Sequence, residues 1–428
     1  MRLAHFFAGG LALVVFTSIE VAAFALDAPH TLRHARPANQ HLSVTNHSRS
    51  HHAVAHHSVS TTTTIRHRKY AAGSTNSGAT LRHASLRVHR HRYYERFTAS
   101  SFASGDIFAD DVTTGENPVV RQAAIDALGD MNGTAVVIDP SNGRILAMVN
   151  QKLALSPGAE PCSTIKLSVA LAALSEGIVT RDTLVRLPGF RMNMTEALAH
   201  SNNLYFEELG RELGFDRVRH YATQFGLGEL AGYNIPGEQL GVYPDQPLAQ
   251  SEGGVGRMCS FGQGVSMTPL QLGAFVAAIA NGGTLYYLQH PSSPLEVASF
   301  QPRVKRTLDI AKLVPDLQDG MAGAVQYGTA RRLRANFQEL PVFGKTGTCS
   351  DKGTRFGWFV SFSDTPQGSM VTVFFLEGGR PTFGPRAAEL TGEFYKNLWD
   401  RNYFADKGPQ STATTPSAVP VSQTVQQQ

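Results

Sequence analysis

The order in which strand and helix signals follow one another constrains the fold of this chain more than any other feature of its sequence. Two β-branched and apolar runs, 134–139 and 144–149, flank a Pro-Ser-Asn-Gly turn and predict an antiparallel hairpin. Helical patterns punctuated by glycine follow from residue 195, and Thr268 before Pro269 predicts a capped helix that ends near residue 280. β-rich runs separated by turns return over 342–376, where we expect a meander, before a last helical pattern at 387–399. This order predicts an α+β fold, in which an antiparallel sheet flanked by helices carries a mostly helical subdomain.

Composition divides the 428 residues into four segments. Residues 1–25 are mostly apolar and end in Ala-Phe-Ala, which predicts a signal peptide or a membrane anchor. Residues 26–100 hold 12 of the 16 histidines and few large apolar residues, so we expect a disordered His- and Arg-rich linker over 26–114. Residues 406–428 are rich in Pro, Ser, Thr and Gln, and we expect a disordered tail there. What remains, 115–405, has the length of one folded domain.

The basic balance of the chain belongs to the linker. Residues 26–100 carry 11 Arg or Lys and 2 acidic residues. The net charge of residues 101–428 is therefore −5, although that of the whole chain is +4. The linker can be a solvated tether, a contact for anionic envelope polymers or lipid head groups, or a metal-binding segment. We favour the tether, because no structured ligand cage surrounds its histidines. We expect no nucleic-acid partner for an exported protein.

A serine and a lysine stand at the start of a strongly apolar run. Pro161 and the Ala- and Leu-rich residues after it predict a buried helix of which only the start is accessible. Ser163 then lies in the first turn and Lys166 lies one turn later on the same face. Backbone N–H groups at a helix start suit a developing oxyanion, and a desolvated lysine can activate a nearby hydroxyl. Ser-x-x-Lys alone is a chance-level pattern, so other motifs have to support it.

The rarest short motif is Lys-Thr-Gly-Thr at 345–348. On a strand, Thr346 and Thr348 face the same side, and Gly347 allows a ligand backbone to approach closely. Together with Lys345 they suit an extended peptide that ends in a carboxylate. The alternative is an ordinary exposed strand with a glycine bulge.

A third candidate lies between two helical patterns, in the sequence Ser-Asn-Asn at 201–203. A loop at a helix junction can direct the Ser201 hydroxyl and the Asn203 carboxamide into a cleft. The alternative is a helix N-cap, a position that both residue types favour.

Ser-x-x-Lys, Ser-x-Asn and Lys-Thr-Gly occur here in the order found in penicillin-binding proteins and serine β-lactamases. Over roughly 115–402 the chain resembles the transpeptidase domain of class B penicillin-binding proteins. The hairpin at 132–148, Gly-Gln-Gly with Thr-Pro-x-Gln at 262–271 and Gly-Trp-Phe-Val at 357–360 extend the resemblance. The chain departs from it by having Pro-Cys-Ser in place of Pro-Gly-Ser and by showing no N-terminal pedestal domain. Ser-x-Asn argues against class D β-lactamases, and a class A deacylating glutamate is not evident.

The resemblance implies a peptidoglycan D,D-transpeptidase that acts outside the cytoplasm, without a cofactor or metal. Ser163 would attack the bond between two terminal D-alanines of a stem peptide, and β-lactams would acylate the same residue. Lys166 would be the base, Ser201 would relay protons and Asn203 would hold the acyl amide. A serine β-lactamase, a D,D-carboxypeptidase and a non-catalytic penicillin-binding sensor or scaffold are the alternatives.

The resemblance also implies how the substrate is held. Lys345 and Thr348 would bind the terminal carboxylate, while Thr346 and Gly347 would line the groove. The backbone N–H groups of Ser163 and Thr348 would form the oxyanion hole.

Three cysteines lie close in sequence to these motifs, at positions 162, 259 and 349. We favour three small buried apolar side chains. The alternative is one disulfide and one free thiol, as an oxidising compartment permits. Cys162 and Cys349 would flank both halves of the oxyanion hole, so a bond between them would tie the cleft.

Overall fold

A five-stranded antiparallel sheet occupies the centre of the computed structural model, which describes residues 98–405. Its strand order is β2-β1-β9-β8-β7. The strands are β1 (Gly133–Asp139), β2 (Arg144–Val149), β7 (Phe343–Asp351), β8 (Thr354–Thr365) and β9 (Gly368–Gly378). The predicted hairpin and the predicted meander are both confirmed, and β1 joins them by pairing with β9, with Val136 opposite Val373.

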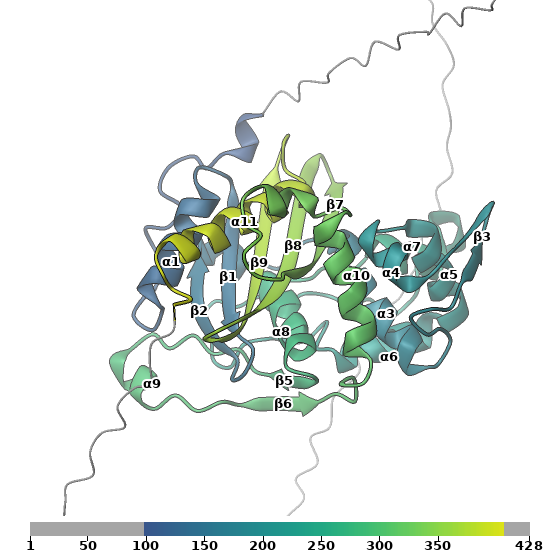
Figure 1. Ribbon diagram of the computed structural model, residues 1–428, viewed down its shortest axis with the longest axis horizontal. Coiled ribbons are helices and arrows are strands. Elements are labelled where there is room, and N and C mark those ends of the chain that lie inside the picture. Colours follow the sequence, from purple (N-terminus) through teal and green to yellow (C-terminus); the bar gives the residue numbers. More distant parts are fainter. Residues whose placement is uncertain (1–97, 406–428) are drawn as a thin grey trace, which may run out of the picture. The chain divides into compact units, whose positions relative to one another are not determined.

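Alternate residues of the central strands face opposite sides of the sheet, and helices cover both sides (Figure 1). In β9, Val373 and Phe375 face one core while Phe374 and Leu376 face the other. Helices α1 (Pro118–Leu128) and α11 (Gly384–Asp400) cover one face, and α8 (Pro269–Ala280) covers the other. The sheet is therefore buried on both sides, which explains its strongly apolar strands.

The helical subdomain lies beside strand β7, and its helix α10 packs against that strand (Figure 1). Its elements are η2 (Cys162–Ile165), α3 (Lys166–Ser175), α4 (Met194–Ala199), α5 (Asn203–Leu213), α6 (Phe215–Gln224), α7 (Gly254–Phe261) and α10 (Val314–Gln326). The α+β fold with a mostly helical subdomain is thus confirmed.

The remaining short elements connect these parts. They are η1 (Ala99–Ser101), α2 (Gln151–Ala154), β3 (Val185–Leu187), β4 (Phe190–Met192), η3 (Gln250–Glu252), β5 (Thr284–Tyr286), α9 (Pro294–Ala298), β6 (Val304–Thr307) and η4 (Arg331–Ala335). Strands β3 and β4 pair with each other, as do β5 and β6.

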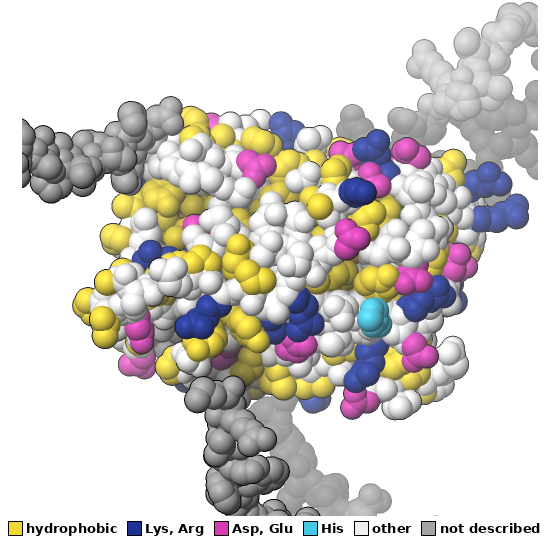
Figure 2. Space-filling model, turned by 90° about the horizontal axis from the view of Figure 1, so that it is seen from below, with side chains coloured by type: hydrophobic (Ala, Val, Ile, Leu, Met, Phe, Trp, Pro, Cys, Tyr) yellow, Lys and Arg dark blue, Asp and Glu magenta, His cyan; other side chains and the backbone are white. Residues whose placement is uncertain are grey.

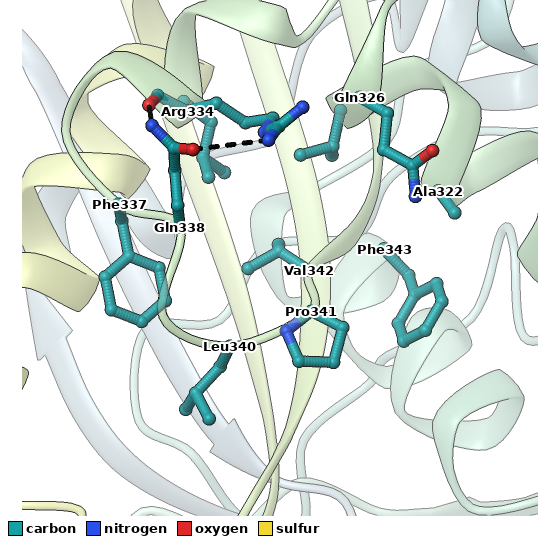
Figure 3. Close-up of a pocket in the computed structure, with 11 residues that line it drawn as sticks. Ala322, Gln326, Arg334, Phe337, Gln338, Leu340, Pro341, Val342 and Phe343 are labelled. Carbon is teal, nitrogen blue, oxygen red and sulfur yellow. Dashed lines mark hydrogen bonds between the residues drawn. The ribbon is translucent and has the colours of Figure 1, made fainter.

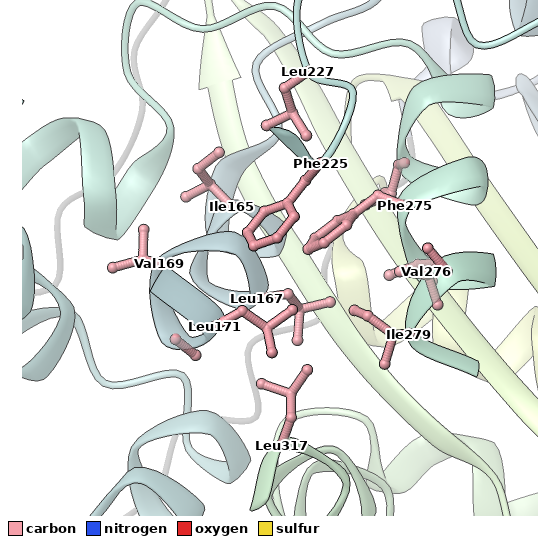
Figure 4. Packing of buried hydrophobic residues seen from close by; sticks show 14 of the residues in the cluster. Ile165, Leu167, Val169, Leu171, Phe225, Leu227, Phe275, Val276, Ile279 and Leu317 are labelled. Carbon is pink, nitrogen blue, oxygen red and sulfur yellow. The ribbon is translucent and has the colours of Figure 1, made fainter. Parts of the chain in front are cut away.

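Helix α3 is anchored by apolar packing against the sheet-covering helix α8 (Figure 4). Leu167 and Leu171 of α3 belong to the same buried cluster as Phe275 of α8, whose ring stacks on Phe225 with centroids 5.0 Å apart. Helix α8 begins as predicted, with Thr268 and Gln271 forming a capping box before the first turn. This packing fixes the start of α3 relative to the sheet, and with it Lys166, the first residue of α3, and Ser163 in the turn before it.

The folded part begins earlier than the sequence predicted. Residues 98–114 fell within the predicted linker, yet the Ser101 hydroxyl forms a buried hydrogen bond with Thr382, at 3.1 Å. Asp111 forms an ion pair of 2.7 Å with Arg121 of α1. Polar contacts of this kind leave no hydrophobic periodicity in the sequence, so the prediction missed them. The rest of the linker, the predicted signal or anchor and the predicted tail lie outside the described residues.

The face in Figure 2 carries acidic and basic side chains interspersed, which agrees with the modest net charge of residues 101–428. Among the helices of residues 98–405, none has the length and apolar character needed to span a bilayer.

Candidate active site

The Ser-x-x-Lys segment forms a 3₁₀ turn that runs directly into α3. Ser163 is the second residue of η2, and Lys166 is the first residue of α3. Lys166 Nζ lies 2.7 Å from Ser163 Oγ. The lysine side chain is fully buried, whereas Ser163 is partly exposed. The predicted proximity of the two side chains is confirmed, with a tight 3₁₀ turn in place of an α-helical one.

The second motif supplies both a helix cap and side chains that contact Lys166, which the sequence left as alternatives. Asn202 caps α5 by accepting a hydrogen bond of 3.0 Å from the Tyr205 backbone N–H. Ser201, before it, has a left-handed backbone with φ of 54°. Lys166 Nζ donates to Asn203 Oδ1 at 2.7 Å and lies 3.2 Å from Ser201 Oγ. Left-handed backbone at a residue other than glycine is uncommon, and here it accompanies a site residue.

Strand β7 brings a second lysine to the same hydroxyl. Lys345 Nζ donates to Ser201 Oγ at 2.8 Å and to the Thr346 carbonyl at 3.0 Å, and its side chain is fully buried. The hydroxyl of Ser201 therefore lies between Lys166 and Lys345. The three motifs, which are spread over 186 positions from Ser163 to Thr348, meet at one place.

The surroundings of both lysines lower their pKa values. Burial, followed by the positive charge of Lys345, holds the pKa of Lys166 well below its usual value, and Glu207 opposes the shift. Burial lowers the pKa of Lys345 to about 7. Two ammonium groups that share one hydroxyl repel each other strongly in a low-dielectric site, so the pair favours one charge over two.

The two threonines of the third motif have different partners. Thr346 is buried, and its hydroxyl donates to Thr329 Oγ1 at 2.7 Å. Thr348 is exposed, and its Oγ1 accepts a hydrogen bond of 2.8 Å from the Gly384 backbone N–H. The Thr348 side chain and its strand edge thus remain open to a ligand, while Thr346 lies deeper.

Strand β7 passes so close to η2, the turn that carries Ser163, that only a residue without a side chain fits at Gly347. A Cβ at this position would lie 2.8 Å from the Pro161 carbonyl oxygen and 3.1 Å from Thr164 Cγ2. The glycine therefore serves contact between two parts of the protein itself, in addition to any contact with a ligand.

Sequence reasoning missed several residues that complete the site. Thr329, three residues after the end of α10, donates its backbone N–H to the carbonyl of Ala199, which lies two residues before Ser201. The rings of Phe206 and Phe261 lie 5.7 and 6.0 Å from Lys166 Nζ. Thr329 and Phe206 belong to no short motif, and Phe261 directly precedes the Gly-Gln-Gly segment, which gave no role for it at the site. Only the fold brings the three residues to the site.

The favoured interpretation of the cysteines is wrong for two of the three. Cys162 and Cys349 form a disulfide that joins positions 187 residues apart. Cys259 is a free, buried thiol whose pKa is raised by burial to about 12. The sequence could not choose between the alternatives, because only the approach of β7 to η2 brings the pair within bonding distance.

The site does not suit a metal cation. Its centre holds two lysines, and within residues 98–405 no group of three acidic, histidine or cysteine side chains is placed to bind a metal.

A cavity of about 510 Å³ lies apart from this site, between α10, η4 and the segment before β7 (Figure 3). Arg334 and Gln338 line it and hydrogen-bond to each other, with Gln338 Nε2 donating to the Arg334 carbonyl at 2.8 Å. None of the three motifs contributes a lining residue.

Several curated proteins are similar to this chain in sequence. The chain is 27% identical over 316 residues to stage V sporulation protein D of Bacillus subtilis, a match covering 61% of this chain and 48% of the relative. It is 26% identical over 347 residues to the peptidoglycan D,D-transpeptidase MrdA of Acinetobacter baumannii, covering 63% and 51%. The chain thus spans about half the length of these curated relatives.

Solved structures share the fold. Penicillin-binding protein A of M. tuberculosis, in an imipenem acyl-enzyme complex, matches with a TM-score of 0.54 and 23% identity, over 66% of this chain and 78% of that one. A peptidoglycan glycosyltransferase from Burkholderia ambifaria matches with a TM-score of 0.56 and 20% identity, over 68% and 99%. The family model for the penicillin binding protein transpeptidase domain matches residues 133–396, which hold all three motifs. The chain therefore belongs to the penicillin-binding protein transpeptidase family.

Proposed function

We propose that this protein is a peptidoglycan D,D-transpeptidase that forms crosslinks through an acyl-enzyme on Ser163. The observation that carries the proposal is the 2.7 Å contact between Lys166 Nζ and Ser163 Oγ, made by a fully buried lysine beside a second lysine. Family membership and the names of relatives such as the D,D-transpeptidase MrdA support the substrate class.

Acylation begins with a proton transfer within the Ser163–Lys166 pair. Because burial and Lys345 lower the pKa of Lys166, its amine is available as a base. Ser163 Oγ attacks the carbonyl carbon of the penultimate D-alanine as its proton passes to Lys166 Nζ. The backbone N–H groups of Ser163 and Thr348 stabilise the oxyanion that forms.

Collapse of this intermediate requires a proton on the departing amine. Ser201 Oγ lies within hydrogen-bond distance of both Lys166 and Lys345, so it can pass a proton from the lysines to the nitrogen. The C–N bond breaks, D-alanine leaves, and the acyl group stays on Ser163. Asn203, which accepts from Lys166, orients that lysine and binds the amide of the acyl chain.

The terminal carboxylate is held at the open edge of β7. Lys345 is fully buried and donates a hydrogen bond to Ser201, so its positive charge attracts the carboxylate without direct contact. The exposed Thr348 hydroxyl supplies direct contact, and Thr346 with Gly347 lines the groove. An amine from a neighbouring stem peptide then attacks the acyl carbonyl. The bond from Ser163 Oγ to the acyl group breaks, the amine's proton returns to Ser163 Oγ through Lys166, and the crosslink is complete.

The test uses the full chain with fluorescent penicillin and then with a stem peptide ending in D-Ala-D-Ala plus an acceptor amine. We expect one covalent label per protein, lost in Ser163→Ala, and mass spectrometry should detect both released D-alanine and the amine-linked product. Absence of label would contradict the proposed activity and favour a non-catalytic sensor or scaffold. Sustained hydrolysis of a chromogenic cephalosporin would identify a β-lactamase, and hydrolysis of the peptide without transfer would identify a carboxypeptidase.

The same proposal locates the protein outside the cytoplasm, because the crosslinked peptides belong to the cell wall. Its partners are then peptidoglycan stem peptides and β-lactams, with the membrane or envelope contacted through the N-terminal segment. Fractionation of cells with an antibody to the folded part should recover the protein with the envelope or outside the cell; recovery in the cytoplasm would contradict the assignment.

A further inference from the structure

The disulfide joins the two chain segments that carry the oxyanion-hole donors. Cys162 precedes Ser163, so the peptide unit that bears the Ser163 N–H begins at Cys162. Cys349 follows Thr348 on β7, and the two cysteine Cα atoms lie 5.6 Å apart. Resting on the proposed acyl transfer at Ser163, we propose that this disulfide is a positioning device that fixes the Ser163 N–H relative to the Thr348 N–H.

The backbone of Cys162 shows what the bond has to maintain. Its φ is 51°, in the left-handed region that residues with a Cβ rarely adopt. Its side chain is fully buried, so it has no freedom to relieve this conformation by turning toward solvent. The φ angle of Cys162 sets the orientation of the following turn and hence the direction of the Ser163 N–H. A covalent bond from its Sγ to another element opposes relaxation of that turn.

The contacts around the disulfide also involve residues next to the nucleophile Ser163 and strand β7. The two sulfur atoms lie 3.4 Å and 3.8 Å from the Glu160 carbonyl oxygen. That oxygen also accepts a hydrogen bond of 3.0 Å from Trp358 Nε1. Trp358 lies opposite Gly347 in the β7–β8 ladder. Glu160 is therefore held against the sheet beside the disulfide. The hydrogen bond from Trp358 and the disulfide together attach η2, the turn that carries Ser163, to the sheet.

Reduction would break the Cys162–Cys349 bond and remove this covalent attachment of η2 to β7. Cys349 is the partly exposed partner, so a thiolate of an external dithiol attacks its Sγ and expels Cys162 as a thiolate. The second thiol of the reagent then releases Cys349. The dithiol is oxidised to its disulfide, and its two electrons and two protons leave two thiols on the protein. Acylation of Ser163 should then slow, because the two N–H donors are no longer held together.

The test measures the rate constant of acylation by penicillin and its non-covalent dissociation constant, with the full chain. Cys349→Ala should lower the rate constant by about tenfold with little change in the dissociation constant, because alignment acts in the transition state. Adding Cys162→Gly should restore part of the rate, since glycine adopts positive φ without strain. A purely structural crosslink would show a lower melting temperature in both variants and no such rescue.

Chemical reduction gives an independent measurement on the unaltered chain. Treatment with a dithiol, followed by its removal, should reproduce the Cys349→Ala rate in the wild-type protein and leave the Cys349→Ala variant unchanged. Cys259→Ala is the matched control, because Cys259 is buried and free, and this variant should lose activity on reduction as the wild type does.

The outcomes separate the two proposals. If the oxidised wild type takes no penicillin label, the proposed function fails. If it is labelled, and if the reduced protein and both variants acylate within twofold of it while their circular dichroism remains native, the positioning role is overturned. Mass spectrometry should verify the reduction by a gain of two hydrogens.

Discussion

Ser201 Oγ lies 3.2 Å from Lys166 Nζ and 2.8 Å from Lys345 Nζ. This arrangement makes the charge on each lysine depend on the other, and burial lowers the pKa of both. The acyl transfer proposed here needs Lys166 neutral as the base and Lys345 charged to attract the substrate carboxylate. At the scale of single residues, the site therefore depends on a difference in protonation between two side chains of the same type.

The pH dependence of penicillin acylation should show this difference. Below the lowered pKa of Lys166 the amine carries a proton and the rate falls. Above about 7, Lys345 loses its charge and the rate constant divided by the dissociation constant falls as well. We expect a bell-shaped profile, measured by stopped-flow or quenched labelling. An alkaline limb that stays flat up to pH 10 would contradict the role given to Lys345.

Lys345 should also lower the stability of the fold. Its pKa is about 7 in the folded protein against 10.5 in a free side chain, so the unfolded state binds more protons between these values. The free energy of unfolding should therefore rise with pH across this window. Lys345→Met should abolish acylation and raise the free energy of unfolding at pH 7 by about 1–4 kcal/mol. Urea denaturation should show this advantage shrinking toward pH 10.5; a constant difference would assign it to packing alone.

At the scale of elements, Thr329 joins three of them. It follows α10, donates its backbone N–H to Ala199 at the end of α4, and its hydroxyl accepts from Thr346 of β7. Ala199 lies two residues before Ser201, and Thr346 directly follows Lys345. One residue thus couples the second and third motifs, through its backbone N–H on one side and its hydroxyl on the other.

Removing this coupling should change catalysis as well as stability. Thr329→Val keeps the shape but loses the hydrogen bond to Thr346, so the acylation rate constant should fall by about tenfold, and Thr329→Ser should recover most of it. Thr134→Val is the control, because its buried hydroxyl donates to the Val149 carbonyl at 2.7 Å, outside the site. Both valine variants should lower the free energy of unfolding by about 1–3 kcal/mol. Equal acylation by the two would reduce Thr329 to a structural role.

At the scale of the whole molecule, two buried clusters on opposite faces of the sheet hold the site elements together. One cluster includes the nucleophile helix α3 and α8, and the other includes α1 and α11. All residues of the three motifs and both clusters lie within 98–405. The activity proposed for Ser163 therefore has its structural basis in this part of the chain.

A protein comprising residues 98–405 should accordingly be acylated by penicillin at the rate of the full chain. It should also behave as an acidic protein, because the 11 Arg and Lys of residues 26–100 are gone. Rate measurements and ion-exchange chromatography at pH 7 test both statements. A rate more than tenfold lower would show that residues outside this range support the site. The matched comparison is the full chain carrying only the deletion of residues 406–428.

The sequence by itself was sufficient for the hairpin, the capped helix at 269–280, the α+β class and the three motifs. Each of these depends on local periodicity, on capping residues or on a rare short pattern, and such signals survive without tertiary structure. Pairing of β1 with β9, the meeting of both lysines at Ser201, the role of Thr329 and the Cys162–Cys349 bond depend on contacts between distant segments. No local pattern encodes such contacts, because they arise only when apolar packing of α3 and β7 against a common core brings the segments together.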